Sequence, residues 1–377
     1  MRIVHVIPAL TKGGAERVVV DLANAAVEDG HEVSIVAAIP ALPELVAQDL
    51  RPEVDIRYVG SGSIRAAYLR LPLWLVRNRK WLFGQDVIHC HLTFGSVFAA
   101  AAQRLRRLLR RRRPAIVETY HAVGMAIPNS ERARHAMLLK GRDAIAFMAE
   151  DSFWRRYAMG NKSTIFRTIP NGIAEPRPAS KEKSRRYRTH CAAIPENALA
   201  VVGTVGRLVP ARRPDLLLEA FANVAEAIGP DVHLLMAGEG GERGALEETA
   251  RRKGIARQVH MPGLVLDPAE PIGAMDLYLT INVGPITGIA GLEAAFLGVP
   301  VIGLQILDDY ESKADDWIWS SRNPGEVALT AVDLLNDRAA LHDLAERQQA
   351  IARQRFSIDA MSRAYDELYS VALARRA

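Results

Sequence analysis

Short apolar runs alternate with longer stretches of helical periodicity along the whole chain. One series of strands is predicted at residues 3–7, 32–38, 55–59, 87–90, 116–119, 144–148 and 165–168, and a second at 198–205, 232–237, 259–261, 277–281, 299–303 and 317–319. Strands that alternate with helices are typical of parallel sheets with helices on both faces. The pattern therefore predicts an α/β protein with two doubly wound sheets.

A polar stretch rich in proline and glycine separates the two series. Pro170, Gly172, Pro176 and Pro178 lie close together, and a charged segment follows at residues 180–188. This composition is typical of a linker between compact domains. We expect a first domain over residues 1–172 and a second domain over residues 173–356.

Two amphipathic helices are expected near the end of the chain, at residues 324–353 and 357–374. The second of them carries Met361, Tyr365, Leu368 and Tyr369 at helical spacing. An apolar stripe of this kind needs a surface to cover it. We therefore expect the C-terminal helix, within residues 357–377, to cross back to the first domain.

Two glycine-bearing turns each lead from a predicted strand into a predicted helix. The first turn holds Gly13 and Gly14, and the second runs from Gly284 to Gly288. Free N–H groups and the helix dipole favour an anion at such a helix start, and glycine lets a ligand approach closely. The turns predict two phosphate sites that face one gap between the domains. For the first turn, the alternative is a tight turn that requires positive φ.

Length, charge and cysteine content limit the classes to which the protein can belong. A chain of 377 residues, 49% of them hydrophobic, can bury two ordinary cores, and its formal net charge is +5. Cys90 and Cys191 are too few for a disulfide framework, which favours a reducing compartment. No hydrophobic stretch reaches spanning length, and the chain starts directly in a predicted strand. We expect a cytoplasmic protein.

Seven short segments stand at distinctive spacing along the chain. They are Gly13-Gly14-Ala15-Glu16, Thr119-Tyr120-His121, Ile169-Pro170-Asn171-Gly172-Ile173, Val205-Gly206-Arg207-Leu208-Val209-Pro210, Ala237-Gly238-Glu239-Gly240, Gly288 with Gly291-Leu292-Glu293-Ala294, and Gly298-Val299-Pro300-Val301-Ile302. In their order and spacing the chain resembles the family 4 glycosyltransferases from residue 1 to about residue 303. The resemblance implies a GT-B fold, with two Rossmann-like domains facing an interdomain cleft. It also implies retaining transfer of a sugar from a nucleoside diphosphate sugar to an acceptor hydroxyl, in polysaccharide, glycolipid or glycoconjugate biosynthesis.

Arginines stand where a diphosphate would bind. Arg207 directly follows a predicted strand, so its guanidinium is expected at the carboxyl edge of the second sheet, where open α/β folds bind ligands. A guanidinium can grip a diphosphate through two parallel hydrogen bonds. Arg212, flanked by Arg213, stands where the family usually has lysine. The alternative is that these arginines are solvated surface charges.

The resemblance assigns three catalytic and ten donor-binding residues. In the family, the residue equivalent to Glu293 holds the ribose, whereas the residue equivalent to His121 lies against the transferred sugar. The alternatives are a surface glutamate, an N-capping Thr287 and a histidine that serves packing. The catalytic set is His121, Arg207 and Arg212; the donor-binding set is Gly13, Gly14, Glu16, Asn171, Gly238, Glu239, Thr287, Gly288, Ile289 and Glu293.

One position departs from the family pattern. Pro285 stands where the family has a first glutamate that contacts hydroxyls of the donor sugar. We interpret residues 284–288 as an altered sugar pocket that uses backbone groups and the Thr287 hydroxyl. A nucleotide-sugar epimerase of the same fold, or a non-catalytic nucleotide-sugar-binding protein, stays open as an alternative.

Neither a metal nor another cofactor is expected. His89 and His91 flank Cys90 at the end of a predicted strand, so both side chains should lie on one face. Two histidines without a third ligand make a weak metal site. The resemblance agrees, because the family uses positive side chains and helix dipoles in place of a divalent ion.

Basic and apolar residues alternate in two stretches of the first domain. One stretch begins at Ile64 and ends at Phe83, and the other runs from Arg104 to Arg113. Such mixtures suit an anionic membrane surface, which favours a lipid-linked acceptor at the inner face of the plasma membrane, beside a sugar acceptor. The alternative is a solvated helix end with core-facing tryptophans. We expect a UDP-sugar as donor, with a GDP-sugar as the alternative, and no nucleic acid.

Overall fold

A computed structural model describes residues 1–11, 13–40, 49–111, 113–121, 139–149, 163–283, 286–306 and 317–375. The chain divides into two compact units. The first unit is Met1–Ala174 with Phe356–Ala377, and the second unit is Glu175–Arg355. The division falls two residues after the domain break expected at residue 172. Gly284, Pro285 and Arg112 lie outside the described residues.

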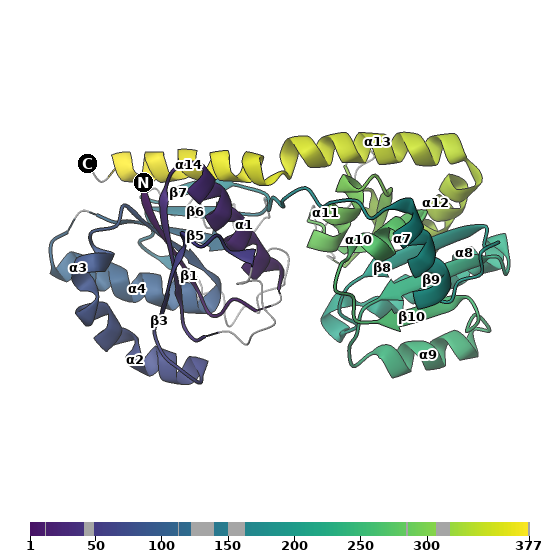
Figure 1. The fold of residues 1–377 in the computed structure, drawn as a ribbon, viewed down its shortest axis with the longest axis horizontal. Coiled ribbons are helices and arrows are strands. Elements are labelled where there is room, and N and C mark those ends of the chain that lie inside the picture. The colour runs from purple at the N-terminus through teal and green to yellow at the C-terminus, as the bar shows by residue number, and fades with distance from the viewer. Residues whose placement is uncertain are drawn as a thin grey trace. The chain divides into compact units, whose positions relative to one another are not determined.

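The first unit is built on a parallel sheet with helices on both faces (Figure 1). In its described part the strand order is β3-β2-β1-β4-β5-β6-β7. The strands are β1 (Arg2–Ile7), β2 (Glu32–Ala37), β3 (Asp55–Tyr58), β4 (Val87–His91), β5 (Ala115–Tyr120), β6 (Ala144–Phe147) and β7 (Ile165–Thr168). The helices are α1 (Gly14–Glu28), α2 (Ile64–Arg77), α3 (Arg79–Leu82), α4 (Leu92–Leu108) and α14 (Ile358–Ala374).

The second unit repeats this architecture, with the described strands in the order β10-β9-β8-β11-β12-β13. The strands are β8 (Ala200–Val205), β9 (Val232–Ala237), β10 (Val259–Gly263), β11 (Leu277–Asn282), β12 (Val301–Gln305) and β13 (Ser320–Ser321). The helices are α7 (Lys181–Arg186), α8 (Pro214–Ile228), α9 (Arg243–Arg252), α10 (Ala269–Gly273), α11 (Ile289–Phe296), α12 (Pro324–Asn336) and α13 (Arg338–Arg355), with a π-helical turn at Tyr187–Cys191 and a 3₁₀ turn at Pro210–Arg212.

Both sheets confirm the predicted doubly wound α/β class, and most strands lie within a few residues of their predicted places. The strand predicted at residues 317–319 lies slightly later, as β13 at Ser320–Ser321, which pairs with β12 at Gly303. The long helix expected at residues 324–353 is two helices. Asp337 between them has an extended backbone, with φ of −117° and ψ of 93°.

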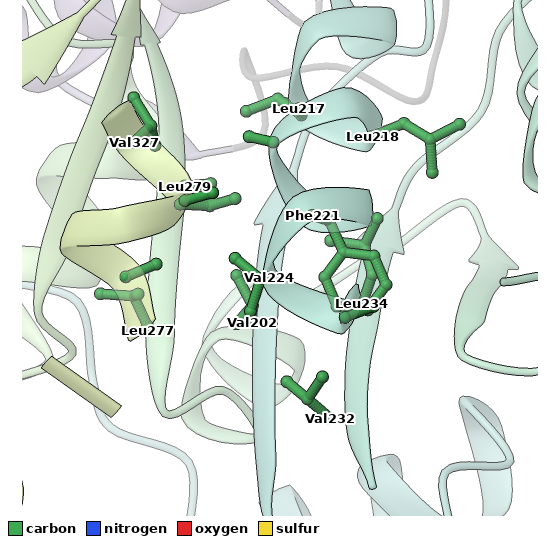
Figure 2. Close-up of a cluster of buried hydrophobic side chains, with 14 of the residues drawn as sticks. Val202, Leu217, Leu218, Phe221, Val224, Val232, Leu234, Leu277, Leu279 and Val327 are labelled. Atoms are coloured by element: carbon green, nitrogen blue, oxygen red, sulfur yellow. The ribbon is translucent and has the colours of Figure 1, made fainter. Parts of the chain in front are cut away.

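Alternation along the strands divides each sheet into two packed faces. In the first unit, Val4 and Val6 of β1 pack with Phe94 and Phe98 of α4 in one cluster. In the second unit, α8 brings Leu218 and Phe221 onto a cluster that also takes in α12 and the strands β8, β9 and β11 (Figure 2). Burial of each large apolar side chain stabilises the fold by about 1.5–3 kcal/mol.

The C-terminal helix α14 covers the other face of the first sheet, as predicted. Tyr365 and Tyr369 are 2% exposed, and the Tyr365 hydroxyl lies 2.6 Å from Thr119 Oγ1 of β5. The start of α14 is held by the 169–173 segment, since the Ile173 N–H donates to the Phe356 carbonyl at 2.9 Å. Gly172 packs directly on this helix, because a Cβ there would stand 2.8 Å from Met361 Cβ and closer still to the Ser357 carbonyl.

We therefore expect Gly172→Ala to destabilise the first unit by about 1–3 kcal/mol, because the added methyl group overpacks the contact with α14. Chemical denaturation followed by circular dichroism measures the change. Gly244→Ala is the matched control, since a Cβ at that helical position meets nothing within 4 Å and alanine favours the helix. Equal stability of the Gly172→Ala protein and the parent protein would contradict the packing role.

Candidate active site

The strand order of the second sheet reverses between β8 and β11, and chemistry-bearing residues gather where these two strands end. Arg207 follows β8 and is exposed, whereas Thr287 and Gly288 follow β11 and precede α11. Ligands of doubly wound folds bind outside the carboxyl ends of the strands at such a switch point. The structure therefore brings the predicted arginine and the second glycine turn to one place.

A guanidinium lies beside the N-cap residue of α11. A Cβ on Gly288, the N-cap residue of α11, would lie 3.7 Å from Arg212 Nη1. The first amides of this helix, at Ile289 and Ala290, lack intrahelical acceptors. A positive group beside the positive end of a helix dipole is unfavourable unless an anion lies between them. This arrangement could therefore bind an anion.

Neighbouring arginines in this loop differ in their pairing. Arg213 donates to both carboxylate oxygens of Asp215 at 2.8–3.1 Å and is thereby held on the surface. Neither Arg207 nor Arg212 has a carboxylate partner among the residues that the structure describes. Both are exposed and are therefore accessible to a ligand.

Two predicted donor-binding residues of the β9 turn have structural partners. Glu239 Oε1 accepts from Arg243 Nη1 at 2.6 Å, while its backbone carbonyl accepts from the Leu208 N–H at 2.9 Å. A Cβ on Gly238 would collide with the Gly206 carbonyl, so glycine is required where the two loops touch. These contacts shape the strand ends.

The residues around α11 exclude the N-cap alternative for Thr287 and add Asn282 to the candidate site. Thr287 does not cap the helix, because its hydroxyl is buried and lies 3.0 Å from Thr280 Oγ1, while Gly288 is the N-cap. Glu293 lies half-buried in the second turn of α11. Asn282, at the end of β11, was missed by sequence reasoning: its Oδ1 is buried with no partner among the described residues. Only the position of a polar residue at a strand end could have indicated it.

In the first unit, the glycine turn is shaped by space rather than by positive φ. Gly13 is the N-cap of α1 with φ of −153°, an extended conformation, and Gly14 is the first helical residue. The positive-φ alternative is therefore wrong. A Cβ on Gly13 would meet the carboxylate of Glu16, which also accepts from the Thr11 hydroxyl at 3.1 Å. Asn171 is half-buried in the segment that pairs with the start of α14.

His121 follows β5 at the carboxyl edge of the first sheet and is partly buried. Its Nε2 lies 3.1 Å from His91 Nδ1, and burial lowers the pKa of His121 to about 4. The imidazole is therefore neutral near pH 7. His89 and His91 lie on one face as predicted, with ring centroids 4.0 Å apart.

A pocket of about 570 Å³ lies elsewhere in the second unit, at the amino end of β11. Arg188 and Asp276 are among the residues that line it, and none of the predicted site residues is.

Two family models match the chain: Glycosyltransferase Family 4 over residues 12–175 and Glycosyl transferases group 1 over residues 200–337. The structure of Anabaena Alr3699/HepE in complex with UDP and glucose matches with a TM-score of 0.75, covering 98% of this chain and 99% of that one at 19% identity. The fold is GT-B, and these matches together support a glycosyltransferase of that fold.

Two curated relatives are similar over different lengths. A D-inositol 3-phosphate glycosyltransferase of Segniliparus rotundus is 35% identical over 117 residues, which are 28% of this chain and only 25% of that protein. D-inositol 3-phosphate glycosyltransferase 2 of Catenulispora acidiphila is 25% identical, with 95% of this chain and 90% of that protein covered.

The buried histidines make the stability of the first unit depend on pH. Burial lowers the pKa of His5 to about 4, against about 6.5 in the unfolded chain. Between these values the unfolded chain binds more protons, so the free energy of unfolding falls as the pH is lowered from 6.5 towards 4. One histidine contributes up to about 1.4 kcal/mol per pH unit.

Denaturation at a series of pH values measures this slope. His5→Phe should make it shallower by up to one proton, whereas His190→Gln, which changes an exposed histidine of the second unit, should leave it unchanged. The buried neutral state of His5 is refuted if the slope is the same in all three proteins.

Proposed function

We propose that the chain transfers a sugar, with retention at the anomeric carbon, from a nucleoside diphosphate sugar to an acceptor hydroxyl. The observation that carries the proposal is the Arg212 guanidinium beside Gly288, the N-cap of α11, at the switch point of the second sheet; this guanidinium has no carboxylate partner among the described residues. UDP is the favoured nucleotide, since HepE, which has the same fold, was solved with UDP and glucose. Polysaccharide, glycolipid or glycoconjugate biosynthesis is the setting that the family resemblance favours.

The residues at the switch point suit the departure of a diphosphate. Arg207, Arg212 and the first amides of α11 would counter the negative charge that develops on the leaving group. Glu293 would hold the ribose hydroxyls, and the neutral His121 would contact the transferred sugar. Fixed positive groups of this kind take the place of a divalent ion, so we propose a metal-independent reaction.

We also propose that the first unit contacts an anionic membrane and receives a lipid-linked acceptor there. The outer side of α2 exposes Leu69, Leu73 and Val76, which are 85%, 52% and 48% exposed. Residues 64–83 carry five basic side chains and no Asp or Glu. Each basic residue near an anionic surface contributes about 1 kcal/mol to binding. No helix in the described part of the chain could span a bilayer.

Two parts of the expected membrane surface face inward instead. Trp74 donates its indole N–H to the Tyr58 carbonyl at 3.1 Å and packs on Phe98, as the core-facing alternative predicts. Arg106 is 2% exposed and pairs with Asp143 at 2.8 Å, because a charge buried on α4 requires a partner. The proposed contact therefore rests on the leucines, Val76 and the remaining basic residues.

Replacing either site arginine should abolish most of the transfer. Arg207→Ala and Arg212→Ala are each expected to lower kcat/KM by roughly 10²–10³, the usual effect of removing one group that stabilises developing charge. Release of nucleoside diphosphate is measured with UDP- and GDP-sugars, with and without sugar or lipid acceptors. Arg213→Ala is the matched control, since that side chain is already paired with Asp215.

Each alternative predicts a different result in this assay. Turnover at the parental rate in the Arg212→Ala protein would overturn the phosphate role. Conversion of the donor sugar without any acceptor would indicate an epimerase. Nucleotide binding without turnover, whatever acceptor is added, would indicate a non-catalytic protein.

Membrane binding is tested by sedimentation with vesicles. The double variant Leu69→Ser/Leu73→Ser should bind anionic vesicles at least about tenfold more weakly than the parent protein, because two exposed leucines no longer enter the bilayer interface. Leu329→Ser is the matched control, since Leu329 is 67% exposed on α12 of the second unit. Equal binding of all three proteins, or equal binding to zwitterionic vesicles, would contradict the proposed contact.

A further inference from the structure

A row of buried histidines crosses the middle of the first sheet, at its own strand-order reversal. His5 of β1 stands in register with His89 of β4, and both are 0% exposed. His5 Nδ1 lies 3.2 Å from His91 Nε2, and His91 Nδ1 lies 3.1 Å from His121 Nε2. Three imidazoles thus form one hydrogen-bonded chain from the sheet interior to its carboxyl edge.

A metal ion is the first alternative, since ligand nitrogens of His5, His89 and His91 lie within 4.8 Å of one another. The existing bonds argue against it. His89 Nε2 and Nδ1 already contact Thr119 Oγ1 at 2.7 Å and the Tyr369 hydroxyl at 2.6 Å. The group contains no carboxylate or thiolate, so a divalent ion there would be a buried charge held by neutral imidazoles alone.

Hydrogen bonding couples the tautomers along the chain. Burial lowers the pKa of each of the three imidazoles, so each is neutral and carries one N–H and one bare nitrogen. Each link needs one donor and one acceptor. The direction of the first link between His5 and His91 therefore fixes the direction of the second, and only two arrangements are possible.

The inner end of the chain distinguishes these arrangements. His5 Nε2 is buried and has no partner among the described residues. If the links ran inward from His121, this atom would carry an N–H with no acceptor, the rarer of the two kinds of unsatisfied buried group. If they run outward, the atom is a bare nitrogen, and the proton of every imidazole lies on Nδ1.

We propose that His5 and His91 are positioning residues that hold His121 in the tautomer with the proton on Nδ1. His121 then presents an N–H donor, rather than a lone pair, to a ligand oxygen. On the proposed function, from which only the ligand's identity is taken, the acceptor is an oxygen of the donor sugar or its phosphate. His89 is not part of the chain, because its two bonds go to the hydroxyls of Thr119 and Tyr369.

Nuclear magnetic resonance on the full-length protein with ¹⁵N-labelled histidine tests the proposal without any substrate. Long-range ¹H–¹⁵N correlations show which ring nitrogen carries the proton. The expected result at pH 7 is protonation at Nδ1 of His5, His91 and His121. Protonation of His121 at Nε2 would overturn the proposal, whatever the activity assays show.

Two variants separate positioning from mere packing. His91→Phe should release His121, whose signals then shift to the mixture of tautomers seen for exposed histidines. His89→Phe, an equal change in the same buried cluster, should leave the His121 tautomer as it was. A mixture of His121 tautomers in both variants would contradict the proposed row of hydrogen-bonded histidines. Stoichiometric metal in the purified protein, removed by a chelator with a shift of the His5 and His91 signals, would show that the cluster is a metal site instead.

Discussion

The reversal of strand order within each parallel sheet is the constraint on which the chemistry of this protein depends. At β1 and β4 in the first unit, and at β8 and β11 in the second, the chain leaves neighbouring strands towards opposite faces. The loops diverge there, so backbone groups and side chains at the strand ends have room for a ligand. In the second unit the same point collects Arg207, Arg212 and the start of α11.

The two units use opposite electrostatics at their reversal points. The second unit exposes fixed positive charge, which suits a diphosphate and cannot be lost by deprotonation. The first unit instead buries neutral imidazoles, which are polar enough to hold hydrogen bonds but carry no charge to repel or attract.

Sequence predicted most of the fold because strand alternation and helix periodicity are local properties. The two sheets, the return of α14 and the shared face of His89 and His91 all followed from such patterns. The sequence could not predict contacts between residues far apart along the chain. His5 lies 84 residues before His89, and the two come together only because β1 pairs with β4. The alternative of an N-capping Thr287 and the surface position expected for Arg106 were both wrong. Their partners, Thr280 and Asp143, are brought to them only by the folded structure.

The docking of α14 has a consequence for synthesis on the ribosome. In the first unit, residues 356–375 cover one face of the sheet and provide hydrogen-bond partners for Thr119 and His89. The whole second unit is translated before these residues. During that interval the part of the first sheet that α14 later covers is exposed, which favours contact with chaperones or aggregation. An N-terminal domain usually completes its fold first during translation. Here the second unit can complete its fold before the first unit, which needs the C-terminal helix.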